Sequence, residues 1–423
     1  MDVAYIALII IGIALVLYIT EWIPIATTSV LACLAMVVFD VLSFGRAFSG
    51  FAHDMVFLIV GMIVVGNALF ETGAAQTAGR AMLKIVKGNE KKAVIILVLA
   101  AIIPSAFLSN TAAAAMMLPV AVTAISASGG LFRKKRMYMV IGIAAVTSGG
   151  LTMIGSTPQL LAQTNVTGLG LEPFGFFDIA ILGAPIIILL IIFYLTVGHK
   201  ILDKMGEDAR DEKMRVAASS QVVTMPHPSK MWIVLGVLIF CIIGFMTSLW
   251  TLGTVALIGA SICIVTGCIT QRRVFETMDW NSVVIIGGSL GLSAGLAYSG
   301  AGQMIAEGAV NVLGADASPW LVVSLLALIA VVLGNFMSST ATAALFIPIS
   351  ISIALQMNID VHSVVLAVVI ACNISYATPV STPPMTMTLS AGYKFTDYLK
   401  FGGLFNLLSY ILIIMLFPFV LNL

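Results

Sequence analysis

Two short polar clusters carry the side chains of this sequence that could bind an ion or a small solute. The first is Ser109-Asn110-Thr111, and the second is Ser338-Ser339-Thr340, at a constant offset of 229 residues. Each cluster is followed by small and apolar residues that end at a proline, Pro119 or Pro348. Hydroxyl and amide groups offer hydrogen-bond donors to an anion and oxygen atoms to a hard cation. The clusters therefore predict a neutral binding site.

Two further motifs recur in the same order along the chain. Ser156-Thr157-Pro158 returns as Ser381-Thr382-Pro383 at an offset of 225 residues, and Gly73-Ala74-Ala75-Gln76 returns as Gly300-Ala301-Gly302-Gln303 at an offset of 227. Three repeated motifs whose offsets differ by so little indicate an internal duplication.

The composition is that of a polytopic α-helical membrane protein. Of 423 residues, 60% are hydrophobic and 9% are charged, and the mean hydropathy is +1.12. A net charge of +1 excludes a nucleic-acid binder that relies on bulk electrostatics. The first apolar run lacks a positive region and a cleavage site, so we interpret it as a retained helix. The cysteines lack metal-ligand spacing and are interpreted as packing residues: Cys33, Cys241, Cys263, Cys268 and Cys372.

The apolar runs predict two repeats, each of five transmembrane spans and one re-entrant hairpin. An apolar stretch of about 30 residues exceeds one span, and a polar break at its middle indicates a hairpin folded within the membrane. The hairpins are expected at about 92–126 and 318–355. The other predicted spans are 3–20, 24–43, 55–72, 137–165, 176–198, 231–248, 252–270, 281–298, 361–392 and 401–421, with further segments at 74–88 and 300–314. The spans 137–165 and 361–392 are interrupted at the Ser-Thr-Pro motifs.

We place the N-terminal repeat at 1–198, a polar cytoplasmic link at 199–230 and the C-terminal repeat at 231–423. Five spans are an odd number, so the second repeat is expected to be inverted relative to the first. With both termini outside, 19 of the 20 lysines and arginines fall in predicted cytoplasmic segments, and Arg46 is the exception. This distribution follows the positive-inside rule and predicts an integral protein of the cell membrane in that orientation.

The predicted site contains no acid and no base. A cation/proton antiporter normally keeps an intramembrane carboxylate, whereas Glu71 and Asp54 lie near predicted span ends. A broken helix directs free N–H groups and about half a positive charge from its N-terminal end toward an anion, and a neighbouring Na⁺ would add positive charge. These features favour anion transport with a cation partner. Close helix packing by small residues is the alternative explanation of the motifs.

At these motifs, and at Pro379-Val380-Ser381-Thr382-Pro383-Pro384, the chain resembles the divalent anion/sodium symporter family of the ion-transporter superfamily over almost its whole length. The resemblance implies a homodimer in which a transport domain moves as an elevator against a scaffold. It places a first sodium site at Ser105, Ser109, Asn110 and Gly155, and a second at Gly334, Met337, Ser339 and Ser381. It places substrate contacts at Asn110, Thr111, Ser156, Thr157, Ser339, Thr340, Thr382 and Pro383.

The chain departs from the family pattern at a few positions. Ser339 stands where the family usually has asparagine, and Gln159 and Met385 stand where asparagine is common. The change at Ser339 removes an amide that would touch both cation and anion. Sodium symport and sodium-independent exchange therefore both remain open.

We interpret the protein as a secondary active transporter of small divalent anions, with sodium-coupled symport of C4-dicarboxylates such as succinate, malate or fumarate as the first expectation. The alternatives are a sodium-independent exchanger, a sulfate or citrate transporter, and a sodium/proton or metalloid-anion antiporter. An intramembrane enzyme is disfavoured because the four histidines lie in or beside predicted loops: His53, His199, His227 and His362. A P-loop motif is absent, so primary active transport by this chain alone is not expected.

Overall fold

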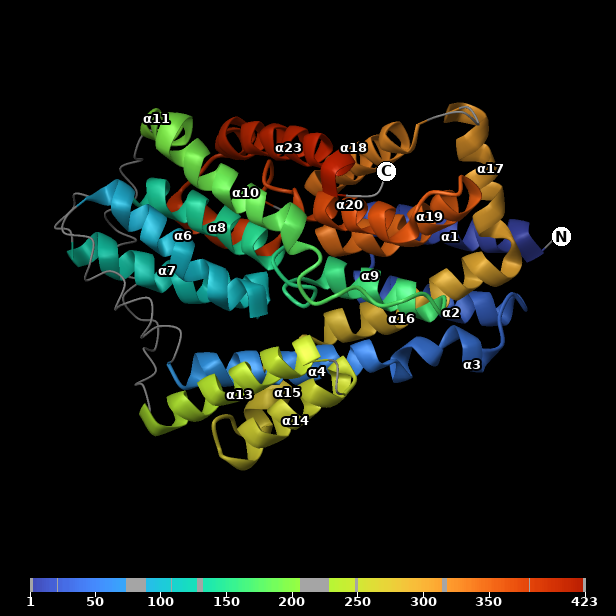
Figure 1. Ribbon diagram of the computed structural model, residues 1–423, viewed down its shortest axis with the longest axis horizontal. Helices are drawn as coiled ribbons and strands as arrows, with labels where there is room; N and C mark the ends of the chain where they lie inside the picture. Colours follow the sequence, from blue (N-terminus) through green and yellow to red (C-terminus); the bar gives the residue numbers. More distant parts are fainter. Residues whose placement is uncertain are drawn as a thin grey trace.

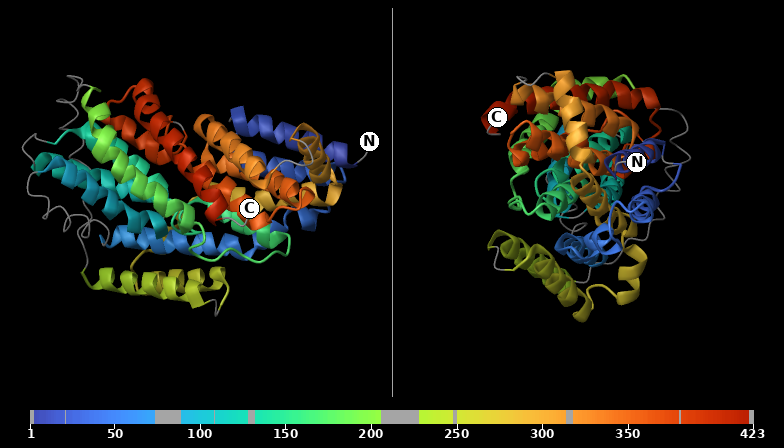
Figure 2. Two further views of the ribbon diagram at one scale, coloured as in Figure 1. Left: turned by 45° about the horizontal axis from the view of Figure 1, so that its top comes forward. Right: turned by 90° about the vertical axis from the view of Figure 1, so that its right-hand side faces the viewer.

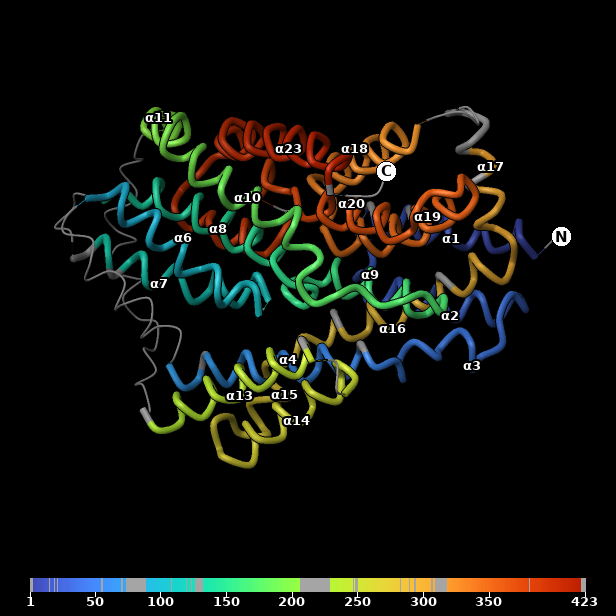
Figure 3. Tube along the Cα trace, in the orientation of Figure 1, coloured from blue at the N-terminus to red at the C-terminus, as the bar shows by residue number. Residues whose placement is uncertain are grey.

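The computed structural model describes residues 3–20, 22–73, 89–107, 109–127, 132–205, 228–247, 250–313, 318–379 and 381–420. Within these ranges the chain folds into helices joined by turns, with no strand (Figures 1 and 3). The all-helical prediction is confirmed. The predicted segment 74–88 lies outside the described residues.

The first part of the chain forms helices that match the order of the predicted spans. They are α1 (Val3–Thr20), α2 (Ile25–Val38), α3 (Phe44–Ala47), η1 (Ser49–Ala52), α4 (Asp54–Glu71), α6 (Glu90–Phe107), α7 (Asn110–Ala127), α8 (Lys134–Gly149), α9 (Thr157–Gly168), α10 (Ala180–Phe193), η2 (Tyr194–Gly198) and α11 (His199–Asp203).

The second part follows a similar order. Its elements are α13 (Pro228–Thr247), α14 (Leu252–Val265), α15 (Gln271–Thr277), α16 (Trp280–Ser299), α17 (Ala301–Leu313), α18 (Pro319–Phe336), α19 (Ser339–Gln356), α20 (Val361–Asn373), α21 (Pro383–Thr388), η4 (Leu389–Ala391), α22 (Phe395–Tyr398), η5 (Leu399–Gly403) and α23 (Leu404–Val420).

Local chemistry moves some helix ends away from the predicted bounds. Helix α2 stops at Val38, before Asp40 adopts a left-handed φ of 55°, and α14 stops at Val265, before Gly267 with a φ of 68°. Helix α10 continues through the π-turn η2 into α11, so helix extends into the predicted link 199–230. The last span begins earlier than 401 because the Asp397 carboxylate accepts from the Lys394 N–H at 2.9 Å and caps the helix start.

Several helices have the length and apolar character of membrane spans. Four stretches of the described chain are long and apolar enough to cross a membrane: Ala180–Asp203, Pro319–Phe336, Ser339–Gln356 and Phe395–Phe419. Eight shorter apolar helices accompany them, among them Ile25–Val38 and Leu252–Val265.

Helices from the two parts of the chain pack in matched pairs. Helix α4 packs on α14, and α16 packs on α2, while α13 adjoins α14 as α1 adjoins α2. A Cβ atom at Gly61 of α4 would lie 2.5 Å from the Ala256 carbonyl carbon of α14, so the two backbones approach closely. Helices α13 and α14 form, with α4, a layer beside the bundle that contains α6 to α10 (Figures 1 and 2).

The helix ends that adjoin several of the predicted basic segments lie at one end of the molecule. The last turn of α4, the first turns of α6, α8 and α13, and the end of α11 lie at the left of Figure 1, whereas the N-terminus lies at the right. The buried core runs along the bundle and includes large side chains from both parts, such as Met116, Met117 and Phe405.

Candidate functional site

Each predicted hairpin forms two neighbouring helices with a serine at the turn. Helices α6 and α7 pack together, as do α18 and α19. The Ser109 hydroxyl accepts from the Ala112 N–H at 3.2 Å, and the Ser338 hydroxyl accepts from the Ala341 N–H at 3.2 Å. These serines therefore cap the second helix of each hairpin, and the predicted contact residues after them occupy its first turn: Asn110, Thr111, Ser339 and Thr340.

The interrupted spans break at corresponding places. The first break separates α8 from α9, and the second separates α20 from α21. The Thr152 hydroxyl donates to the Ala106 carbonyl, and the Thr378 hydroxyl donates to the Asn335 carbonyl at 2.6 Å. In each break, a threonine hydroxyl therefore forms a hydrogen bond with the end of the first helix of the hairpin that precedes it.

Oxygen atoms converge around Asn110, which begins α7 and lies beside the first break. One end of its amide lies 3.0 Å from the Gly155 carbonyl oxygen, 3.1 Å from the Ala145 carbonyl oxygen and 3.1 Å from the Ser105 hydroxyl. The Ser105 hydroxyl also donates to the Ala145 carbonyl. With its NH₂ group turned to this end, Asn110 satisfies these acceptors; with its oxygen there, that oxygen lies close to three other oxygens from different segments.

Gly149 makes this arrangement possible. It is the last residue of α8, and a Cβ atom at this position would overlap the Asn110 amide. Any residue with a side chain would therefore push Asn110 away from the carbonyls. Sequence reasoning missed both Gly149 and Ala145, because their role depends on backbone proximity between helices.

The helices that carry the predicted substrate residues pack against one another across the two parts of the chain. Helix α9 packs on α19 and α20, and α7 packs on α21. The Ser156 hydroxyl lies 3.0 Å from the Asn373 Oδ1 atom and donates to Gln159 Oε1, while Gln159 Nε2 donates to the Gly149 carbonyl at 3.2 Å. The buried Thr382 hydroxyl has no hydrogen-bond partner within the described residues. Pro383 is exposed at the start of α21.

The second predicted cation set is arranged differently from the first. Gly334 and Met337 are buried at the end of α18, and the Ser381 hydroxyl donates to the Ser375 carbonyl at 2.6 Å and the Thr378 carbonyl at 3.0 Å. Ser339 is half-buried. Ser381 therefore uses its hydroxyl proton within its own loop.

A cavity of about 120 Å³ lies between α4 and the first break. Its apolar wall includes Leu58 and Met62 of α4, and its polar wall includes Ser109, Ser156 and Thr157. Among the other predicted substrate and cation residues, only Gly155 also lines the cavity. The Asp279 carboxylate is a further part of the lining. No motif in the sequence indicated that Asp279 would line this cavity.

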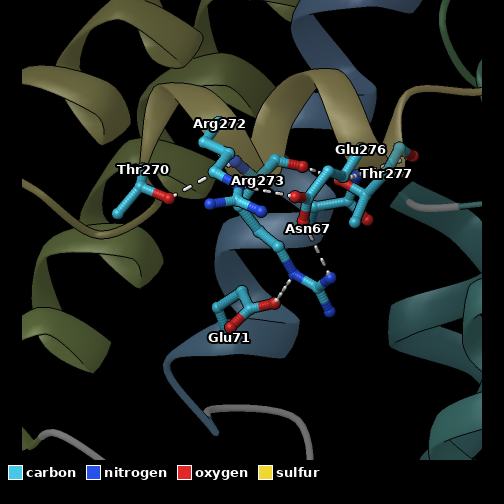
Figure 4. A network of polar contacts seen from close by, with 7 residues as sticks. All are labelled: Asn67, Glu71, Thr270, Arg272, Arg273, Glu276 and Thr277. Carbon is cyan, nitrogen blue, oxygen red and sulfur yellow. Dashed lines mark hydrogen bonds and ion pairs between the residues drawn. The ribbon is translucent and has the colours of Figure 1, made fainter.

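Side chains at the α15 end of the cavity tie α4 to α15. Asn67 Nδ2 donates to the Thr277 hydroxyl at 2.8 Å, and one turn later Glu71 accepts from Arg273 Nε at 2.6 Å (Figure 4). The hydrogen bond with Glu71 raises the pKa of the Arg273 guanidinium. Arg273 is about half exposed, so we expect this ion pair to contribute about 1 kcal/mol or less.

Long apolar helices and a cavity with one apolar and one polar wall are the features of an integral membrane transporter. The family model of the citrate transporters (CitMHS) matches residues 15–364 and 315–422. The chain belongs to the citrate transporter family. This result agrees with the predicted place in the ion-transporter superfamily and identifies a transporter rather than an enzyme.

Relatives extend over nearly the whole chain. An uncharacterised transporter of Haemophilus influenzae is 29% identical over 415 residues, which cover 94% of this chain and 88% of the relative. The sodium-dependent dicarboxylate transporter SdcS of Staphylococcus aureus is 25% identical over 450 residues, covering 95% and 83% of the two chains. The protein of the same name from Staphylococcus saprophyticus is 23% identical, with 95% and 83% coverage.

Two solved transporter structures share the fold. MtrF of Neisseria gonorrhoeae, described among antimetabolite efflux pumps, has a TM-score of 0.60 and 15% identity, covering 98% of this chain and 95% of MtrF. The YdaH transporter of Alcanivorax borkumensis also has a TM-score of 0.60, with 14% identity and coverage of 88% and 86%.

Proposed function

We propose that this protein carries out sodium-coupled symport of C4-dicarboxylates, with succinate, malate or fumarate as substrates. The observation that carries the proposal is the cavity lined by the hydroxyl groups of Ser109, Ser156 and Thr157, beside the oxygens that converge at Asn110. The full-length similarity to two sodium-dependent dicarboxylate transporters supports it.

The coupling cation would bind at Ser105, Ser109, Asn110 and the Gly155 carbonyl, and we add the Ala145 carbonyl to this set. Neutral oxygens from side chains and an unwound backbone suit Na⁺. The ion would supply the positive charge that the site otherwise lacks.

The dianion would bind beside this cation. Its carboxylates would accept hydrogen bonds from Asn110, Thr111, Ser156 and Thr157 of the first half, and meet Ser339, Thr340, Thr382 and Pro383 of the second. The starts of α7, α9 and α19 would add the positive ends of their helix dipoles. The buried Thr382 hydroxyl, which has no partner within the described chain, is free to pair with a carboxylate at the start of α21.

We further propose two inverted repeats, with both termini outside, in a homodimer that works as an elevator. The matched pairs α4–α14 and α2–α16 support the repeats. Positive φ at Gly73 and Gly300, 75° and 79°, supports the equivalence of those two motifs. The position of the cavity between the α4 layer and the bundle supports movement of one against the other.

Citrate is the second candidate substrate, because the matching family is that of the citrate transporters. Sulfate and sodium-independent exchange also remain as candidates, since the same neutral donors can hold them. A cation/proton antiporter is the less favoured alternative.

Uptake of labelled succinate into proteoliposomes tests the proposal. We expect accumulation with an inward sodium gradient and little uptake with equimolar potassium. Uptake that ignores sodium but requires internal succinate would identify an exchanger instead. Competition by citrate and sulfate in the same assay ranks the substrates.

Asn110→Ala should reduce sodium-driven uptake to background, because it removes an oxygen from the cation and a donor from the anion. Ser409→Ala is the matched control, since its buried hydroxyl has no partner within the described chain. Both variants should reach the membrane at normal levels. Wild-type uptake by the Asn110 variant would reject the proposed site.

A further inference from the structure

Different polar groups contact the backbone of the two breaks. In the first, the carbonyls of Ala145 and Gly155 face the Asn110 amide and the Ser105 hydroxyl. In the second, side chains from α18 and α23 form hydrogen bonds with the backbone of the loop between α20 and α21. This asymmetry bears on how many cations the transporter can couple.

Asn335 joins the end of α18 to the second break. It is 6% exposed, and its Nδ2 group donates to the Val331 carbonyl at 2.7 Å and the Ile374 carbonyl at 3.4 Å. Its Oδ1 atom accepts from the Ala377 N–H at 2.9 Å. One side chain therefore bonds on both sides of the turn in residues 374–377.

Asn406 of α23 completes this amide pair. Its Nδ2 group donates to Asn335 Oδ1 at 2.8 Å, and its Oδ1 atom accepts from the Tyr376 N–H at 3.0 Å. One turn earlier, Gly402 lies so close that a Cβ atom would overlap the Tyr376 carbonyl. Helix α23 thus supports the break directly.

The first half has no counterpart of Asn335. The matching hydrogen bonds of Thr152 and Thr378 go to the carbonyls of residues 106 and 335, which are 229 positions apart, the same offset as the tips. Alanine occupies position 106. Conversely, the positions that correspond to Asn110 and Gly149 are Ser339 and Ser375, so the second half lacks both the amide and the glycine that accommodates it.

We infer that Asn335 and Asn406 are positioning residues that hold the second break in its binding geometry without a cation, and that transport is coupled to a single sodium ion bound at the first break. This inference rests on the proposed function and specifies its stoichiometry. The Asn335 and Asn406 amides donate to acceptors within the chain, whereas the oxygens around Asn110 can exchange the amide donor for an ion.

Sodium titration of the purified protein tests the number of cations without transport. We expect sodium to raise the melting temperature along a curve with a Hill coefficient near one. In proteoliposomes, simultaneous uptake of labelled sodium and labelled succinate should give a ratio near one. A Hill coefficient or flux ratio near two would overturn the inference and leave sodium symport intact. Absence of any sodium effect would reject the proposed coupling as well.

Variants of the amide pair test the positioning role. Asn335→Ala and Asn406→Ala should each raise the KM for succinate by roughly tenfold, as expected for loss of a buried hydrogen bond, with the half-saturating sodium concentration unchanged. Ser409→Ala, on the same helix as Asn406, should change neither quantity. An altered sodium dependence with an unchanged KM would contradict the assignment. The ratio of sodium to succinate uptake by the wild-type protein gives the stoichiometry even if one variant does not fold.

Discussion

At the scale of single residues, Gly149 leaves the space that the Asn110 amide occupies. The amide can approach the Gly155 and Ala145 carbonyls only because Gly149 has no side chain. Ser109, which the resemblance assigned to the cation, also caps α7 through the Ala112 N–H. Its substitution would therefore weaken both the helix start and the proposed ion site, so Asn110 and Gly149 are the cleaner positions to change.

Gly149→Ala should abolish sodium-stimulated succinate uptake and lower the free energy of unfolding by about 1–3 kcal/mol, the usual cost of overpacking. The measurements are proteoliposome uptake and the melting temperature with and without sodium. Gly236→Ala is the control, because a Cβ atom there meets nothing within 4 Å. Normal sodium-driven uptake by the Gly149 variant would show that the position of the Asn110 amide is not critical.

Small residues determine how the helices approach one another at the scale of elements. Gly61 brings α4 against α14, and Gly183 of α10 lies against the Gly150 carbonyl at the end of α8. Lipid provides little hydrophobic drive for helix association, so close backbone packing has to supply much of the stability. The α4–α14 contact also fixes the wall of the cavity that Leu58 and Met62 form.

Gly61→Val should separate α4 from α14 and lower the melting temperature by several degrees, because the new side chain would meet the Ala256 backbone. Thermal unfolding in detergent, followed by loss of the monodisperse peak in size-exclusion chromatography, measures the effect. Gly12→Val is a suitable comparison, since its surroundings within 4 Å are open. Equal stability of the two variants would contradict the close contact.

At the scale of the whole molecule, the cavity lies between the α4 layer and the helix bundle. One wall belongs to α4, and the opposite wall belongs to the first hairpin and to the break before α9. An elevator motion would change the separation of these walls in each transport cycle. The hydrogen bond of Asn67 with Thr277 and the ion pair of Glu71 with Arg273 hold α15 to α4, so we expect these two helices to remain together.

Cross-linking Met62→Cys to Ala112→Cys with a reversible bifunctional thiosulfonate should block uptake, because both residues line the cavity from opposite walls. Reduction should restore transport. The five native cysteines are buried and can remain in place. Each single variant with the same reagent provides the control, and full uptake after complete cross-linking would argue against relative movement of the two walls.

The sequence alone determined the helical membrane class, because an apolar composition of 60% and polar breaks within long apolar runs leave few other structures. It also placed Asn110 and Ser156 at breaks, since repeated polar residues stand out against apolar neighbours. Only the tertiary structure decided the partners of these residues. The carbonyls of Ala145 and Gly155 and the space above Gly149 depend on how distant backbones approach, and backbone groups leave no signature in residue type. The hydrogen bond between Asn335 and Asn406 joins side chains 71 positions apart, so it also depends on the packing of their helices.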